Sequence, residues 1–146
     1  MKHIPHRAIA LPILFLLLTV SSVFGQSDRQ TVVNVPFNFI VGEKLLPAGQ
    51  YVIERNKRDS ETVWAISRKE TGGSRTLFMT IPVRSVKNQE QTKLVFHRYE
   101  NFYFLSSIWT AGGNSGRELQ LSDRERNLED RLLAKREEII LTNRGR

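Results

Sequence analysis

Residues 93 to 109 read KLVFHRYENFYFLSSIW, and this stretch decides the fold class. Leu94 and Phe96 share one face of the first apolar run, which has the period of two that is typical of a half-buried β-strand. A second apolar run, FYFLSSIW, follows it. Only Glu100 and Asn101 separate the two runs, and a polar link of two residues between strands indicates a tight hairpin. The stretch therefore predicts two adjacent antiparallel strands.

Four more runs upstream have the same period. The first, residues 31–41, contains Pro36, which has no N–H and so predicts an edge strand or a bulge. The others are YVIERN, TVWAISR and TLFMTIPV, and the last of these places apolar side chains on one face at Leu77, Met79, Ile81 and Val83. Six short strands joined mostly by short loops predict a mainly β fold: a single antiparallel β-sandwich or small barrel of about six strands.

One C-terminal α-helix is predicted after the strands. Ser122 followed by Glu125 forms a capping box, in which the serine oxygen accepts from a helix N–H and the glutamate reaches back. We expect the helix to run from about Asp123 to Leu141. Its apolar stripe is narrow, which favours a peripheral element that docks loosely or pairs with another chain and does not complete the β-core. The stripe consists of Leu121, Leu128, Leu132 and Ile139.

The first 25 residues have the three-part plan of a secretory signal peptide. A basic start with Lys2 and Arg7 precedes an apolar centre, and SSVFG follows with small residues before Gln26. We expect cleavage before Gln26, and the alternative is an uncleaved membrane anchor. The location predicted is exported, periplasmic or extracellular, with the membrane involved only through this segment if it stays uncleaved.

The domain plan that follows is a signal peptide at 1–25, a β-domain at 26–118, and a charged C-terminal helix and tail at 119–146. Cleavage would leave 146 − 25 = 121 residues, which suits one domain with one modest core. The chain has no cysteine, so an exported fold stands on its hydrophobic core without disulfides. Thiol chemistry and cysteine-ligated metals are excluded as well.

Two segments carry a resemblance. VNVPFNFIVGEKLLPAGQYVI, with LVFHRYENFYFLSSIWTAGGNSGREL and the following RERNL, resembles a family of small secreted bacterial β-rich proteins of unassigned activity. The shared signatures are VPFxF-x-VG…LPAGxY near the start and FHRY…YFLSxIW near the end. The resemblance implies an exported β-rich domain and gives no catalytic residues to carry over. Members of that family often have Gly and Asp where this chain has Glu100 and Asn101.

The segment GGNSG, residues 112–116, raises the question of a catalytic serine. Ser115 lies between Asn and Gly as a serine-protease nucleophile does, and His97 is the one histidine after the predicted signal peptide. A triad also needs a carboxylate that orients the histidine, and only Glu100 lies between the two. We therefore interpret the glycines as a flexible turn. A backbone nest that holds an anion, with Arg117 beside it, is the less favoured alternative.

Basic residues gather in the predicted β-domain. The formal charge is +7 overall, and the segment 52–98 contains ten basic and five acidic residues. Such an excess attracts polyanions such as acidic polysaccharide, lipid headgroups or nucleic acid, although no specific nucleic-acid motif is present. Aromatic side chains could serve as stacking platforms or belong to the core. They are Tyr51, Trp64, Tyr99, Tyr103 and Trp109.

These patterns together predict an exported, non-enzymatic β-domain that binds a partner or has a structural role at the cell envelope. The partner is an envelope polyanion or a protein. No catalytic, cofactor-binding or metal-ligating residue is predicted, since a lone histidine has no second metal ligand. Two alternatives stay open: a small hydrolase that uses Ser115 and His97, and a small barrel that binds an apolar ligand.

Overall fold

The computed structural model describes residues 30–56, 61–70, 74–132 and 136–143. Within these ranges the chain is mainly β with a single helix near the C-terminus, as the sequence predicts. The predicted signal peptide at 1–25 lies outside the described residues. Among the residues that are described, no helix is long and apolar enough to cross a membrane.

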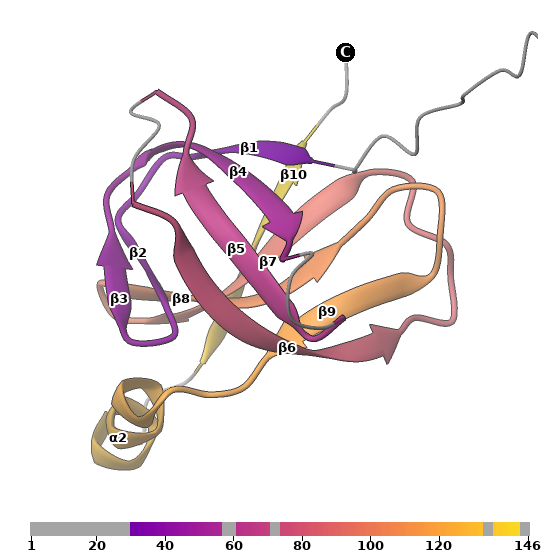
Figure 1. Cartoon of the computed structure of the whole chain (residues 1–146). Coiled ribbons are helices and arrows are strands. Elements are labelled where there is room, and N and C mark those ends of the chain that lie inside the picture. The colour runs from indigo at the N-terminus through magenta and orange to yellow at the C-terminus, as the bar shows by residue number, and fades with distance from the viewer. Residues whose placement is uncertain (1–29, 57–60, 71–73, 133–135, 144–146) are drawn as a thin grey trace, which may run out of the picture.

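The secondary structure comprises ten strands and helix α2 in these ranges (Figure 1). The elements in chain order are β1 (Thr31–Val35), β2 (Phe39–Val41), β3 (Lys44–Leu46), β4 (Gly49–Arg55), β5 (Val63–Arg68), β6 (Thr76–Arg84), β7 (Thr92–Tyr99), β8 (Phe102–Trp109), β9 (Ser115–Leu119), α2 (Asp123–Leu132) and β10 (Glu137–Asn143).

The strands form one strongly curled sheet. Its main pairing path runs β1-β4-β5-β6-β9-β8-β7-β10, and β2 and β3 branch from β8. Every pairing is antiparallel except the one between β2 and β8. The two end strands lie close to each other (Figure 1). The side-chain amide of Asn143 on β10 donates to the carbonyl of Val32 on β1. Because no ladder joins these strands in the described ranges, the sheet is open.

The inner face of the curled sheet holds the main hydrophobic core. Aromatic rings pack edge to face at its centre, with Phe39 5.1 Å from Tyr51 and 5.6 Å from Phe96 between ring centroids. Aliphatic side chains from eight strands complete it: Val33, Val35, Val41, Leu46, Ile53, Ile66, Leu94, Leu105, Ile108 and Leu119. The close packing of these core side chains weakens the alternative of a barrel that holds an apolar ligand.

Pro36 divides the first predicted strand into two. The chain leaves β1, which pairs with β4, and re-enters the sheet as β2 beside β8. Phe37 lies in the break and stacks on Tyr103 at 4.1 Å between ring centroids. The predicted single strand over 31–41 is therefore wrong, and the missing N–H of Pro36 is the physical reason for the break.

The buried face of β6 is not the face on which the sequence pattern places the large aliphatic side chains. Thr76, Phe78 and Thr80 are buried, whereas Leu77, Met79 and Ile81 are exposed on the outer face. Thr80 satisfies its hydroxyl by donating to the carbonyl of Thr62 at 3.1 Å. One residue of register decides which face is buried, and here the large ring of Phe78 occupies the interior.

The predicted helix over 123–141 is correct only in its first half. The helix ends at Leu132, and residues 137–143 form β10, which pairs with residues 92–98 of β7. Ile139 and Leu141 pack against the core while Ile140 between them is exposed, which is the period of two of a strand. The expectation that this segment stays outside the β-core is therefore wrong. The free edge of β7 and the β-branched residues of the segment favour a strand.

A chain that ends at Leu121 tests the role of this C-terminal segment. Without α2 and β10, β7 loses its neighbour and the cover of its outer face, so we expect loss of the cooperative thermal transition. Circular dichroism during heating measures it. A chain that ends at Asn143 serves as the control and should melt like the full chain. Cooperative melting of the Leu121 chain near the midpoint of the full chain would contradict this role.

Candidate functional site

Helix α2 is fixed to the outer face of the sheet at its N-terminus. Ser122 caps the helix by accepting from the N–H of Glu125 at 3.1 Å, as the capping box predicts. The N–H of Asp123 donates to a carboxylate oxygen of Glu43, in the turn between β2 and β3, at 3.0 Å. Two of the N–H groups that a helix start leaves without partners are thus satisfied, one of them by another element.

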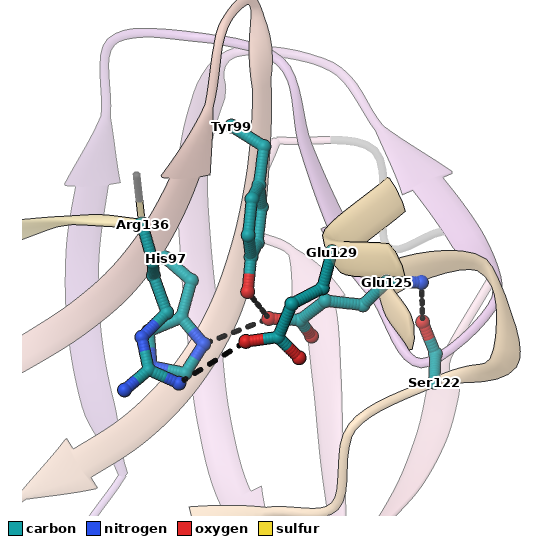
Figure 2. A network of polar contacts seen from close by, with 6 residues as sticks. All are labelled: His97, Tyr99, Ser122, Glu125, Glu129 and Arg136. Carbon is teal, nitrogen blue, oxygen red and sulfur yellow. Dashed lines mark hydrogen bonds and ion pairs between the residues drawn. The ribbon is translucent and has the colours of Figure 1, made fainter. Parts of the chain in front are cut away.

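The side chain of Glu125 does not complete the capping box. It turns into the protein, and one carboxylate oxygen lies 2.7 Å from Nδ1 of His97 and 3.3 Å from the hydroxyl of Tyr99 (Figure 2). Glu125 is 4% exposed and His97 is 8% exposed. Since an ionised carboxylate only accepts hydrogen bonds, Nδ1 carries a proton and donates. This polar network joins the helix to two neighbouring outward positions of β7.

Apolar contacts surround the network. Leu128 of α2 packs against a small outer cluster that consists of Ile40, Tyr99 and Phe104. The rings of Tyr99 and Phe104 meet nearly edge to face, with centroids 5.9 Å apart. One turn further along the helix, Glu129 lies 4.0 Å from Arg136, the residue that precedes β10 (Figure 2). Strand β7 is consequently buried on both of its faces at this end.

The phenol of Tyr99 is held neutral by its surroundings. Its pKa is raised to about 12, most of all by burial and in addition by the nearby negative charges of Glu125 and Glu129. Arg136 acts the opposite way and lowers it. The phenol therefore stays protonated at neutral pH and donates a hydrogen bond to the Glu125 carboxylate.

A groove opens beside this network on the outer face of the sheet. Its volume is about 530 Å³, and β10 borders it on one side and the end of β6 on the other. The residues that line it come from five strands and the loop after β6: Val83, Arg84, Ser85, Gln89, Lys93, Val95, His97, Ser106, Ser107, Trp109, Glu118, Arg136, Glu138 and Ile140. Such a volume lies within the usual range for small-ligand sites.

The floor of the groove is polar because β8 contains a bulge. Val95 pairs with Ser107 and Phe96 pairs with Leu105, so Ser106 is an extra residue in β8 without a partner on β7. The bulge places both serines toward the groove, where they are nearly buried beside His97. Bulges redirect side chains in this way, often near functional sites. The pair SS within the apolar run FYFLSSIW is the sequence signal for this bulge.

Trp109 forms one wall of the groove and is held in place from two sides. Its indole N–H donates to the hydroxyl of Ser107 at 3.0 Å, and Nζ of Lys93 lies 5.6 Å from the ring centroid. The ring also lies flat over Gly116 of β9, where a Cβ would come within 2.6 Å of a ring carbon. Gly116 is therefore needed for this close approach, in addition to any role in a turn.

The structure does not bring Ser115 and His97 together. Ser115 pairs with Arg84 at the start of β9, whereas His97 pairs with Phe104 at the far end of β8. Five or six residue steps of about 3.3 Å separate them along β8, or roughly 17–20 Å. They also lie on opposite faces, since Ser115 shares a face of β9 with the core residue Leu119, whereas His97 alternates with the core residue Phe96 on β7. The hydrolase that uses this pair has no geometric support.

The structure also gives little support to an anion nest at GGNSG or to a metal site at His97. The backbone of this loop pairs with the loop after β6: Ser85 N–H donates to Asn114 and Gly112 N–H donates to Gln89, at 2.8 and 2.9 Å. The anion nest thus loses one of its N–H groups. Across the described ranges, no group of three or more His, Cys, Asp or Glu residues could hold a metal ion.

The predicted aromatic platforms separate into core and surface. Tyr51 and Tyr99 are buried, and Tyr103 stacks on Phe37, so these rings are closed to a ligand. Trp64 packs against the core, with the Arg117 guanidinium 5.8 Å from its ring centroid. Trp109 is the predicted platform that lines the groove.

Comparisons of the chain with protein-family models, with curated proteins and with solved structures give no match. The resemblance described from the sequence accordingly stays an expectation.

Replacing Glu125 tests the network. Glu125→Ala leaves the His97 N–H and the Tyr99 hydroxyl buried without an acceptor, and each such group costs about 1–3 kcal/mol. We expect a loss of about 2–4 kcal/mol in the free energy of unfolding, measured with urea. Glu125→Gln keeps an acceptor and should lose less. Glu129→Ala, one turn along the helix, is the control and should cost at most about 1 kcal/mol. Equal losses in the two alanine variants would show that the network contributes nothing.

The raised pKa of Tyr99 predicts a loss of stability at high pH. Folding favours the neutral phenol, so the contribution is complete below pH 10.0, the ordinary pKa, and is lost as pH rises through about 12. We expect the urea midpoint to fall over this window and to fall less in Tyr99→Phe. Burial also raises the pKa of Tyr51, so a residual slope should remain in that variant. Identical slopes in the two proteins would refute the assignment to Tyr99.

Proposed function

We propose that the protein is an exported, non-enzymatic binding protein of the cell envelope, and that the groove beside Trp109 takes an acidic polysaccharide. The observation that carries the proposal is the composition of the groove. One aromatic wall, three cationic side chains and a floor of nearly buried hydroxyls meet in a volume of about 530 Å³.

The charges of the groove favour an anion without excluding a polyhydroxylated ligand. Arg84, Lys93 and Arg136 line it together with two acids, Glu118 and Glu138. The formal sum is +1. Cations of this kind bind carboxylates, and the two acids accept hydrogen bonds from sugar hydroxyls.

The floor and the wall favour a sugar ring over an isolated anion. Ser106 and Ser107 offer hydroxyls that both donate and accept, and Gln89 at the rim offers an amide. Trp109 forms an apolar wall beside which a pyranose ring can pack, while its N–H is already used by Ser107. The Lys93 ammonium that lies over the ring can meet a carboxylate of the ligand there. A simple inorganic anion would use neither the ring nor the hydroxyls.

The expectation of export and the charge of the chain agree with this ligand class. The chain carries +7 in total, or +5 without Lys2 and Arg7 of the predicted signal peptide. A positive protein raises the local concentration of an anionic polymer and speeds its association. The groove is open at the surface, so a long polysaccharide can bind along it without one of its ends having to enter first.

Calorimetry with oligogalacturonate tests the proposal. We expect oligogalacturonate to bind and a neutral oligoglucan of equal length to bind much less. Lys93→Gln should weaken binding severalfold, and raising the salt concentration should weaken it further, because surface charges are screened over about 8–10 Å at 0.1–0.15 M salt. Lys69→Gln, outside the groove, is the matched control and should bind normally.

Two results would reject the proposal. One is equal affinity for the charged and the neutral oligosaccharide, which would show that the cations have no role. The other is an unchanged affinity in Lys93→Gln, which would place the ligand elsewhere on the surface.

A further inference from the structure

The outer face of β6 carries a row of exposed apolar side chains. Leu77, Met79 and Ile81 point outward at alternate positions and are 54%, 67% and 45% exposed. Val86, in the loop that follows, is fully exposed. We call these four residues the β6 row. The three strand positions alone span about 13 Å at 3.3 Å per residue.

The β6 row is unusual because β6 buries two threonines while it exposes three large apolar side chains. Thr76 and Thr80 face the core beside Phe78. The leucine, methionine and isoleucine of the row face the solvent. Helix α2, which covers the outer face of β7, packs on Ile40, Tyr99 and Phe104 and not on β6. Contiguous exposed apolar surface of this kind marks a site of contact with a partner or a membrane.

Cations flank both ends of the row. Arg84 and Lys87 lie at the end that leads to Val86, and Lys44 and Arg75 lie beside Leu77 and Met79 at the other end. Arg75 is paired with Glu54 at 2.6 Å. Residues 74–93 contain four basic residues, Arg75, Arg84, Lys87 and Lys93, and one acid, Glu90, which gives a formal charge of +3.

We propose that the β6 row docks on a lipid surface with anionic headgroups, with Leu77, Met79, Ile81 and Val86 entering the interface and Lys87 meeting the headgroups. Short apolar insertions add to the electrostatic attraction, which is worth about 1 kcal/mol for each basic residue near such a surface. The loop tip is suited to insertion because its apolar side chain is followed at once by a cation.

Charge favours this occupant over a second copy of the chain. Residues 74–93 carry a formal charge of +3, and adding Lys44 with the acids Glu43 and Glu54 at the Leu77 end leaves +2. Two β6 rows packed face to face would set this positive charge against itself, and like charges across an interface cost affinity. A surface of anionic headgroups complements it.

This docking does not rest on the saccharide proposal. The row lies on β6, whereas the groove floor lies on β7 and β8, with β9 between them in the sheet. Met79 and Lys87 are not among the residues that line the groove. Variants at these positions therefore test the lipid contact alone.

A single fluorescent label tests the docking in the full chain. Because the protein has no cysteine, Met79→Cys can be labelled at one position with an environment-sensitive dye. Ile140→Cys is the matched control, since Ile140 is a β10 residue that is 51% exposed and four strands from β6 along the sheet. This control also detects any binding that the apolar residues 8–20 cause by themselves, which would not place Met79 selectively in the interface.

Vesicles of phosphatidylcholine with one quarter phosphatidylglycerol are compared with vesicles of phosphatidylcholine alone. We expect a blue shift and a rise in emission at position 79 with the anionic vesicles and little change at position 140. Lys87→Gln should weaken this response about fivefold, as loss of one cation near the surface predicts. The response should also fall with salt.

Three outcomes would overturn the docking. The first is no response at position 79, and the second is an equal response at 79 and 140. The third is a concentration-dependent blue shift at 79 without vesicles, which would show that a second copy covers the row. Far-ultraviolet circular dichroism of each labelled variant verifies that it is folded, and a substitution at such exposed positions should leave the thermal midpoint almost unchanged.

Discussion

The outer half of the structure depends on the hydrogen bonds that the buried carboxylate of Glu125 accepts from His97 and Tyr99. A curled sheet normally buries one face, yet β7 is buried on both, with Leu94 and Phe96 inside and His97 and Tyr99 outside. The outside positions are polar, so a cover made of apolar side chains alone would leave them without partners. Glu125 accepts from both, and a buried network of this kind is stable only when each member has its partner.

The same contact organises the candidate site. By accepting from Nδ1, Glu125 fixes the orientation of the His97 ring, which lies at the floor of the groove. The chain must then pass from α2 to β10, and β10 closes the far side of the groove with Arg136, Glu138 and Ile140. The groove is thus built mainly from central strands and is bordered by β10, which follows helix α2 in the chain. Loss of the helix contact would alter the groove as well as the stability.

The outer surface has two regions with opposite chemistry. On β7, β8 and β9 it is concave and polar, with serine hydroxyls beside a tryptophan. On β6 it is apolar and exposed, with cations at both ends. The two regions meet at the end of β6, where Val83 and Arg84 line the groove. A protein that lies on an anionic membrane through β6 would keep the groove available beside the membrane surface, where charged polysaccharides of an envelope are found. The two proposals are compatible, although neither requires the other.

The sequence by itself determined the strand class, the β7–β8 hairpin and the start of the helix. Each is a local matter: the alternation of KLVFHRY, the two-residue link at Glu100 and Asn101, and the Ser122 hydroxyl that reaches an N–H three residues away. Only the tertiary structure decided the partner of Glu125, because a glutamate at that helix position can turn back to the cap or inward to His97, 28 residues away. It likewise decided that residues 137–143 form a strand, since the free edge of β7 lies far from them along the chain. Finally, it decided which face of β6 is buried: the alternation gives two faces, and the packing of Phe78 in a core built from distant strands selects one.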